Sequence, residues 1–574
     1  MEEELTDQAK NGMGQTWEDL AGAGGRSKQD FPPAVCRKLL DILELRDRFL
    51  SGVASAEPAA TAEQLPTTVF TGACPTEVAD VFRLARKTVR DPSVRAFCRT
   101  RLGLLEAQMG AYKLENRDEE HAETRQNHAD FNSIPKVDTH LHASAIMSAK
   151  QLCRFMDAVY KKDKDRKYGD STLGEAMQAA GYSGSKGADM DKLGVKGSYL
   201  MFHNFSNFNA AFAPLQSRDL KKIFFGTEAL EGEYLFRIIE QSAAIAQLDN
   251  IFLEPRFSIY GRDPDEWVKL ARWVRRWRLN EVEGILIAVQ LPRVYSVWRR
   301  KGMVGSFGDL LRNFWQPLFD TTLRPEDNPE LAWFFPFLRI IDTVDDESTD
   351  DAFDFFDLPA PDYWTSEENP PYSYYHYYMH VNLARLKALW QSRSKAEDAE
   401  GFALTLRPHC GEAGPTHHLL TAFILCRGVS HGIQLDQDPA LQYLYYLAQV
   451  PIAVSPISNS VLFLKYCENP FPRFLHRGLC VALTTDDPLM FHTTPTPVLE
   501  EYATARHAFD LDDTDLAEVA RNSCIAAFSD EERSVIHGDD NPHLTNIPPR
   551  RLLFRAHCLA REWNYMRSAS LPPK

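Results

Sequence analysis

Residues 136–143, KVDTHLHA, place two histidines two positions apart, shortly after an aspartate and within a short apolar run. On a β-strand, residues i and i+2 point to the same face. His140 and His142 can therefore present their imidazoles side by side, as a metal ion requires. The H-x-H pattern alone is weak evidence, because histidines also pack at strand ends. The remaining ligands must come from elsewhere in the chain.

Seven further short apolar runs follow, each ending in polar or charged residues, and helical patterns separate several of them. The runs are IFLEPRFSIYG, ILIAVQLPR, LRIIDTVDDES, FALTLRPHCGEAG, GVSHGIQL, IAVSPISN and VALTTDDP. Strands that alternate with helices indicate a parallel sheet. Eight such units predict an α/β fold, a (β/α)8 TIM-type barrel with an N-terminal helical extension and helical insertions. In that barrel, functional side chains lie at the C-terminal ends of the strands.

Bulk composition narrows the class of protein. The chain has 574 residues, 44% of them hydrophobic, and a net charge of −16, which argues against nucleic acid as a partner. Ten cysteines are scattered without a C-x-x-C pair, which favours a reducing compartment. We find no secretory signal pattern and no apolar run of membrane-spanning length. We therefore expect a cytoplasmic enzyme with no membrane partner.

The domain organisation follows from local composition. Residues 1–65 are mostly polar and low in large apolar side chains, and we expect disorder there with one possible helix in FPPAVCRKLLDILELRDRFL. Residues 66–130 carry apolar residues at three- and four-residue spacing and are expected to form the helical extension. We assign residues 131–560 to the barrel and 561–574 to a C-terminal tail.

Polar clusters end four of the predicted strands. They supply three imidazoles and a carboxylate, a ligand set that suits Zn²⁺ and leaves a position open for water. The expected ligands are His140, His142, His409 and Asp486. Glu412, three residues beyond a ligand, is a candidate general acid, and His431 can orient or deprotonate the water. Glu412 and the Asp486–Asp487 pair could instead cap helices. The joint pattern favours the metal site.

Several longer motifs resemble the adenosine/AMP deaminase family of metal-dependent hydrolases, and AMP deaminase is the closer match. They are HADFNSIPKVDTHLHAS, EPRFSIYGR, VDDES, NPPYSYYHYYM, RPHCGEAG, LQYLYYLAQVPIAVSPISNS and FLHRGLCVALTTDDP. The resemblance runs from about residue 75 to about residue 560. HCGE, where adenosine deaminases tend to have HAGE, and the SYYHYYM segment separate the two branches.

The resemblance implies a zinc-dependent conversion of AMP to IMP and ammonia. Glu412 would donate a proton to N1 of the purine, His431 would act as the base for the attacking water, and Asp487 would contact the N7 region. It also implies a homo-oligomer, a tetramer in most relatives. The residues expected at the substrate are His142, Glu412, Asp487, Pro488, Leu489, Met490, Asn207, Phe208, Asn209, Phe212, Arg256, Arg262 and Arg293.

The sequence departs from the family in its substrate segment. Residues 205–214 read FSNFNAAFAP where the family has a pattern like F-D-K-F-N-x-K-Y-N-P, so Asn207 and Ala211 replace two lysines. Met490 replaces a glutamine. A hydrogen bond to a charged group is worth about 1.5–3 kcal/mol, so the affinity for AMP could fall.

Three arginines at the ends of the second and third strands offer another way to hold a phosphate: Arg256, Arg262 and Arg293. Pairing of these arginines with Asp345, Asp346 and Glu347 is the alternative.

Two other functions stay open at this point. The chain could deaminate another 6-amino or N6-substituted purine nucleotide or nucleoside. It could also be a catalytically altered, nucleotide-binding subunit. The presence of both Glu412 and His431 favours an enzyme, because a pure binding protein has no need of either.

Overall fold

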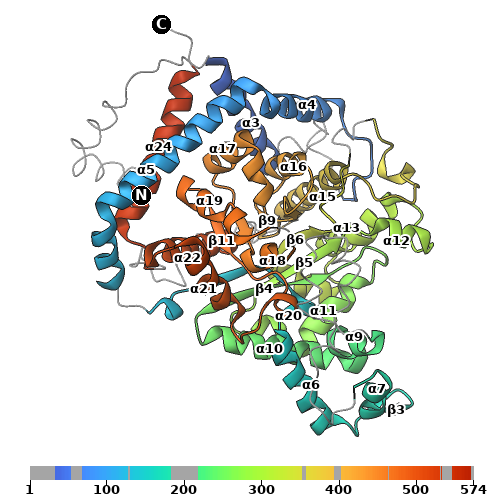
Figure 1. The fold of residues 1–574 in the computed structure, drawn as a ribbon. Coiled ribbons are helices and arrows are strands. Elements are labelled where there is room, and N and C mark those ends of the chain that lie inside the picture. The colour runs from blue at the N-terminus through green and yellow to red at the C-terminus, as the bar shows by residue number, and fades with distance from the viewer. Residues whose placement is uncertain are drawn as a thin grey trace.

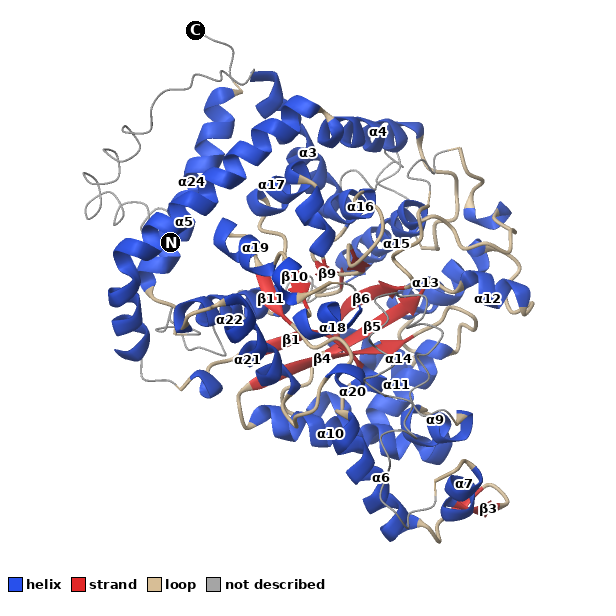
Figure 2. Ribbon diagram, viewed as in Figure 1, coloured by secondary structure: helices blue, strands red, loops and turns tan. Residues whose placement is uncertain are grey.

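The computed structural model describes residues 33–52, 67–126, 130–182, 217–351, 357–393, 402–462, 464–529, 532 and 546–570. Its centre is a ring of parallel strands surrounded by helices (Figures 1 and 2). The strands are β1 (Lys136–His142), β4 (Ile251–Ser258), β5 (Ile287–Pro292), β6 (Leu338–Val344), β7 (Thr405–Leu406), β8 (His409–Cys410), β9 (Val429–His431), β10 (Ile452–Val454) and β11 (Val481–Leu483).

Backbone hydrogen bonds close the ring. The strands pair in the orders β1-β4-β5-β6-β7 and β8-β9-β10-β11, and every pair is parallel. β7 and β8 are two halves of one strand on either side of Pro408. At the other seam, the Asp486 N–H donates to the His140 carbonyl at 2.8 Å, and the His142 N–H donates to the Asp486 carbonyl at 3.1 Å. The predicted eight-stranded barrel is therefore confirmed.

Helices lie between successive strands and cover the outside of the ring (Figure 2). They are α6 (Ala149–Asp163), α7 (Leu173–Ala179), α9 (Arg218–Phe225), α10 (Glu233–Gln247), α11 (Glu266–Trp277), α12 (Tyr295–Arg300), α13 (Phe307–Leu323), α14 (Pro329–Phe334), α15 (Tyr372–Arg393), α16 (His417–Leu425), α17 (Pro439–Leu447), α18 (Pro456–Leu462), α19 (Phe471–Arg477), α20 (Pro488–Phe491), α21 (Pro497–Phe509) and α22 (Asp513–Ala527). A short hairpin of β2 (Lys167–Tyr168) and β3 (Ser171–Thr172) follows α6. The strands are buried on both faces, as expected when helices cover a parallel sheet.

The N-terminal extension is helical, with α3 (Pro33–Leu50), α4 (Thr76–Arg90) and α5 (Pro92–Gln126). The possible helix within residues 31–50 is therefore present. Arg46 of α3 is buried and donates to the backbone carbonyls of Phe423 and Cys426, so this helix is fixed to α16 of the barrel. Residues 1–32 lie outside the described part of the chain, and the expected disorder there stays a prediction.

The C-terminal helix α24 (Pro549–Ala569) lies beside α5 (Figure 1). It crosses the boundary at residue 560 that we drew from the sequence. Glu562, beyond that boundary, is buried, pairs with Arg101 of α5 and accepts a hydrogen bond from the Tyr443 hydroxyl at 2.7 Å. Because this buried contact holds the helix, residues 561–569 continue α24 rather than start a separate tail.

The barrel interior holds charged pairs as well as apolar side chains. Arg256 of β4 pairs with Asp342 of β6 at 2.7 Å, and Arg407 pairs with Glu254; all four are at most 2% exposed. Buried charges need partners of this kind to offset the loss of hydration. Across the described helices, none combines the length and the hydropathy that a membrane crossing needs.

Candidate metal centre and active site

Four side chains converge at the C-terminal end of the barrel. His140 and His142 end β1, His409 begins β8, and Asp486 follows β11 at the seam of the ring. Their potential ligand atoms all lie within 4.8 Å of one another. The Nε2 atoms of His140 and His409 are 3.0 Å apart, and Asp486 Oδ1 lies 3.6 Å from His140 Nε2 and 3.5 Å from His142 Nε2.

The hydrogen-bond partners fix which ring nitrogens carry protons. His409 Nδ1 faces the Asp342 carboxylate at 2.9 Å, and His142 Nδ1 faces the amide oxygen of Gln290 at 2.7 Å. Each Nδ1 is therefore the donor, and each Nε2 presents a lone pair to the cluster. Lone pairs and a carboxylate gathered at these distances repel one another unless a cation lies among them. This donor set fits a divalent metal ion.

Three residues that sequence reasoning missed orient the ligands. Asp342 accepts from both the ring and the backbone N–H of His409, Gln290 holds His142, and the Ser458 hydroxyl donates to Asp486 Oδ2 at 2.7 Å. Partners of this kind fix the ring orientation and make the ligand more basic. Asp342 could have been suspected from the sequence, because it is a carboxylate inside an otherwise apolar strand. Gln290 and Ser458 carry no such signal.

Glu412 and His431 lie next to this cluster. Glu412 Oε1 is 3.4 Å from His431 Nδ1 and accepts a hydrogen bond from Asn459 at 3.1 Å. Burial, together with the nearby Asp486 and Glu347 carboxylates, raises the pKa of Glu412 well above its usual value. Burial lowers the pKa of His431 to about 3, although Asp486 opposes the shift. Burial therefore favours the protonated form of the Glu412 carboxyl group and the neutral form of the His431 imidazole.

The backbone is constrained at two of these positions. His431 has φ 75° and Asp486 has φ 63°, in the left-handed region that non-glycine residues rarely adopt. If the strand continued, Asp486 and Asp487 would point to opposite faces of the sheet. The strand ends at Leu483, and the left-handed turn at Asp486 aims its carboxylate at the histidines. Such local strain is often found at functional sites.

Asp487 and α20 form another side of the site. Asp487 is 6% exposed, and its Oδ1 finds no hydrogen-bond partner among the described residues. Burial, together with the negative charge of Asp486, raises the pKa of Asp487 to about 7. Pro488, Leu489 and Met490 follow within α20 and are buried.

The structure separates the three arginines that we considered for a phosphate. Arg256 has no exposed side-chain surface; it donates to Asp342, the Thr139 carbonyl and Ser430 inside the barrel. Arg293 is 5% exposed, lies 3.8 Å from Asp345 and covers the ring of Tyr372.

The remaining arginine, Arg262, has 39% of its side chain exposed and pairs with Glu266 at 2.7 Å. The structure does not support phosphate contact by Arg256, since its guanidinium is enclosed and both of its terminal nitrogens donate to groups inside the barrel. Arg293 instead follows the alternative, pairing with a carboxylate of VDDES.

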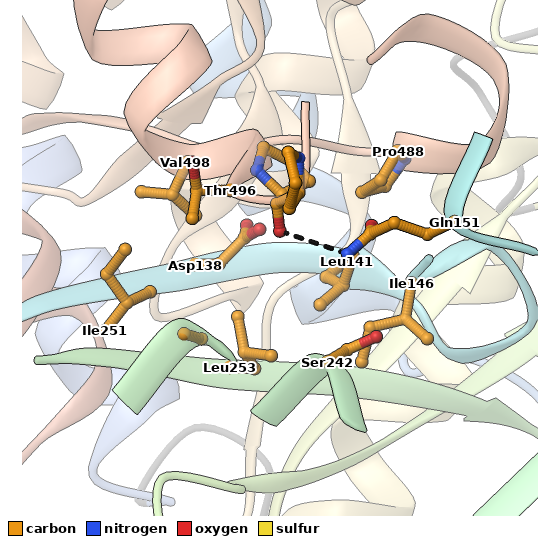
Figure 3. Close-up of a pocket in the computed structure, with 13 residues that line it drawn as sticks. Asp138, Leu141, Ile146, Gln151, Ser242, Ile251, Leu253, Pro488, Thr496 and Val498 are labelled. Carbon is orange, nitrogen blue, oxygen red and sulfur yellow. Dashed lines mark hydrogen bonds between the residues drawn. The ribbon is translucent and has the colours of Figure 1, made fainter. Parts of the chain in front are cut away.

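Four expected substrate residues, Asn207, Phe208, Asn209 and Phe212, lie outside the described residues. A separate cavity beside β1 is lined by Asp138, Leu141, Ile146, Leu253 and Pro488, among others (Figure 3). None of the four candidate metal ligands lines it.

A sequence model of the AMP deaminase family matches residues 50–570. The chain belongs to the AMP deaminase family. AMP deaminase 3 of Rattus norvegicus is 39% identical over 500 residues, which cover 84% of this chain and 64% of that protein. The AMP deaminase of Saccharomyces cerevisiae is 39% identical over 494 residues, covering 82% of this chain and 60% of its own. This family member thus spans less than two thirds of the length of these relatives.

Two deaminases are among the solved structures that match this chain. An adenine deaminase from Arthrobacter aurescens covers 75% of this chain and 99% of its own, with 16% identity and a TM-score of 0.38. An Arabidopsis N6-mAMP deaminase covers 70% of this chain and 96% of its own, with 14% identity and a TM-score of 0.39.

Proposed function

We propose that this chain is a zinc-dependent aminohydrolase that converts AMP to IMP and ammonia. The observation that carries the proposal is the convergence of three imidazoles and one carboxylate beside Glu412, whose pKa is raised, and His431, whose pKa is lowered. Ligands of Zn²⁺ in a tetrahedral site lie about 3.3–3.6 Å from one another, given bonds of roughly 2.0–2.2 Å. The distances of 3.0, 3.5 and 3.6 Å among His140, His142, His409 and Asp486 are close to that spacing.

A bound Zn²⁺ would act as a Lewis acid that activates water near neutral pH. The chain's own residues supply the rest of the chemistry. Glu412 donates a proton to N1 of the purine, which makes C6 electrophilic, and the neutral His431 accepts a proton from the attacking water. Asp487 is buried, its Oδ1 has no hydrogen-bond partner in the described part of the chain, and it orients the base at its N7 edge. Addition of water at C6 and departure of ammonia give the 6-oxo product.

A second candidate is a deaminase for another 6-amino or N6-substituted purine. The replacement of two family lysines by Asn207 and Ala211, and of a glutamine by Met490, favours it. Met490 is 9% exposed and lies in α20, three residues beyond Asp487. An amide at this position would form hydrogen bonds, whereas the thioether of methionine packs against apolar groups. The presence of both Glu412 and His431 argues against a subunit that binds nucleotide without catalysing a reaction.

Arg262 is the arginine that we retain for phosphate contact, because it alone of the three has an exposed guanidinium. A cytoplasmic location and a homo-oligomeric, tetrameric assembly stay predictions that rest on composition and on family resemblance.

A substrate panel tests the proposal. Purified zinc-loaded chain is incubated with AMP, adenosine and N6-methyl-AMP, and the release of ammonia or methylamine is followed. Fastest release of ammonia from AMP supports the proposal, and a preference for N6-methyl-AMP supports the second candidate. No turnover of any of the three, with one zinc per chain, contradicts both. Equal efficiency for AMP and adenosine would remove Arg262 from phosphate binding.

A further inference from the structure

Glu347 follows β6 in the VDDES segment and has no role in the chemistry described so far. Its side chain is 3% exposed, although it carries a carboxylate. Buried carboxylates usually have a structural or functional reason, because burial without partners costs several kcal/mol. The hydrogen bonds of the Glu347 carboxylate indicate which part of the site it contacts.

The carboxylate of Glu347 holds the backbone on which Glu412 stands. The Glu412 N–H donates to Glu347 Oε2 at 2.9 Å, and the Gly411 N–H faces the same carboxylate. One side chain from a neighbouring strand end therefore meets two consecutive backbone N–H groups of the HCGE turn and accepts a hydrogen bond from the second. β8 ends at Cys410, and beyond it Gln434 donates to the carbonyl of Gly411 at 2.8 Å and to that of Glu412 at 3.2 Å, so Glu347 holds the N–H side of the turn.

Backbone packing brings the two segments into direct contact. Gly414 has φ 72°, and a Cβ at this position would collide with the carbonyl oxygen of Glu347. The turn after Glu412 thus fits against Glu347 only because residue 414 is glycine. The segment after Glu347 is also anchored: Asp351 accepts from the Tyr372 N–H and from His418 Nε2, at the N-termini of α15 and α16. Glu347 therefore acts from a firmly held position.

The carboxyl group of Glu347 also lies close to Glu412 and His431. Oε1 is buried without a hydrogen-bond partner among the described residues, and Glu347, Glu412 and His431 bring ligand atoms within 4.8 Å of one another. Burial raises the pKa of Glu347 to about 8, so that near neutral pH the group is mainly the neutral acid.

We propose that Glu347 is a positioning residue that clamps the Gly411–Glu412 backbone and so aims the Glu412 carboxyl at the purine ring. The role in turnover rests on the function proposed above; the clamp itself does not. A misplacement of a reacting group by about 1 Å can cost about 100-fold in rate, without a matching loss of substrate binding.

The variants separate positioning from charge. Glu347→Ala removes the acceptor and is expected to lower kcat for AMP about 100-fold, with KM within about 3-fold and zinc content unchanged. Glu347→Gln keeps an acceptor oxygen and resembles the neutral acid, so kcat should stay within about 5-fold of the wild type. Asp346→Ala and Asp346→Asn are the matched controls, because Asp346 is the adjacent carboxylate and, among the described residues, accepts its hydrogen bonds from the backbone N–H and hydroxyl of Ser348 in its own segment.

Amide hydrogen exchange provides a readout that does not depend on the substrate. In zinc-loaded Glu347→Ala, the amides of Gly411 and Glu412 should exchange at least about 10-fold faster, with α16 unchanged; Asp346→Ala should show neither effect. Unchanged exchange at Gly411 and Glu412, wild-type kcat in Glu347→Ala, or equal kcat losses in both Glu347 variants would overturn the proposal. If the wild type does not turn over AMP but the amides of Gly411 and Glu412 exchange faster in Glu347→Ala as expected, the proposed function is wrong and the positioning of the backbone by Glu347 is supported.

Discussion

Asp342 shows how one buried residue organises the site. Its carboxylate lies 2.9 Å from the Nδ1 of His409, accepts the His409 backbone N–H at 2.9 Å and pairs with Arg256 at 2.7 Å. Complete burial would raise the pKa of Asp342, but Arg256 and the nearby His409 and His142 hold this pKa below its usual range. A permanently ionised Asp342 makes His409 a fixed and basic ligand.

Asp342→Asn should weaken metal binding. Loss of this partner is expected to lower zinc affinity about 10- to 100-fold, because His409 loses its orienting carboxylate. Zinc affinity is measured by competition with a chelator. Arg339→Gln is the control on the same strand, since Arg339 pairs with Glu532 outside the barrel. Unchanged zinc affinity in Asp342→Asn would refute this role.

Glu412→Gln should separate metal binding from catalysis. The amide cannot donate an acidic proton, so we expect kcat to fall by about 100- to 10,000-fold, with zinc remaining near one per chain. Ammonia release and elemental analysis are measured on the same preparation. Loss of zinc in this variant would show that Glu412 belongs to the ligand set instead.

Among single residues, the sequence predicts those whose role depends on residue type and on position at the end of a strand. The histidines of β1, the HCGE turn and the aspartate pair all follow predicted strands, and the structure brings them together. It does not predict tertiary partners: Gln290 and Ser458 become orienting residues only when β5 and α18 reach the cluster. The burial of Arg256 inside the barrel could not be predicted from the sequence either, because a strand pattern does not show which side chains fill the barrel.

Secondary-structure elements follow the predicted order, but their boundaries depend on tertiary contacts. The fifth strand is divided into β7 and β8 because Pro408 has no N–H to donate to the ladder. The sequence run FALTLRPHCGEAG contains this proline, so the interruption of the strand could be predicted from the sequence. The continuation of α24 past residue 560 was not, since it depends on buried Glu562 meeting Arg101 and Tyr443.

The junction between α24 and α22 should make stability depend on pH. Arg551 of α24 is fully enclosed and pairs with Glu120, Asp515 and Glu518. Despite burial, Arg551 and Lys113 lower the pKa of Asp515 from 3.8 to about 2. A group whose pKa is lowered by folding stabilises the fold above its unfolded value, so this contribution, about 2 kcal/mol, is lost as pH falls from about 4 to 2.

Asp515→Asn should therefore reduce the free energy of unfolding by at least about 2 kcal/mol at pH 6, and by less at pH 3. Urea unfolding at the two pH values measures the difference. Asp513→Asn in the same helix is the control, because Asp513 is 48% exposed and pairs with Arg506 on the surface. A penalty that is the same at both pH values would contradict the assignment.

The whole molecule brings distant parts of the sequence to one point. The four ligands come from β1, β8 and the end of β11, separated by up to 346 residues along the chain, from His140 to Asp486. Because β1 and β11 meet at the seam of the ring, an ion held there also ties the first strand to the last. Metal binding and barrel stability are therefore linked.

Removal of zinc should destabilise the barrel. A ligand that binds only the folded state, at a free concentration about 1,000-fold above its Kd, adds about 4 kcal/mol to stability. Thermal unfolding of zinc-loaded and chelator-treated chain should differ by several degrees, and readdition of zinc should restore the higher value. His409→Ala should show no such difference. Equal unfolding temperatures for both forms of the wild type would contradict the link.

The most direct test of the metal centre is anomalous diffraction from zinc-loaded crystals of the full chain, collected on both sides of the zinc absorption edge. We predict one strong peak among the ring nitrogens of His140, His142 and His409 and the carboxylate of Asp486. No peak at that point, or the strongest peak elsewhere in the molecule, would contradict the account.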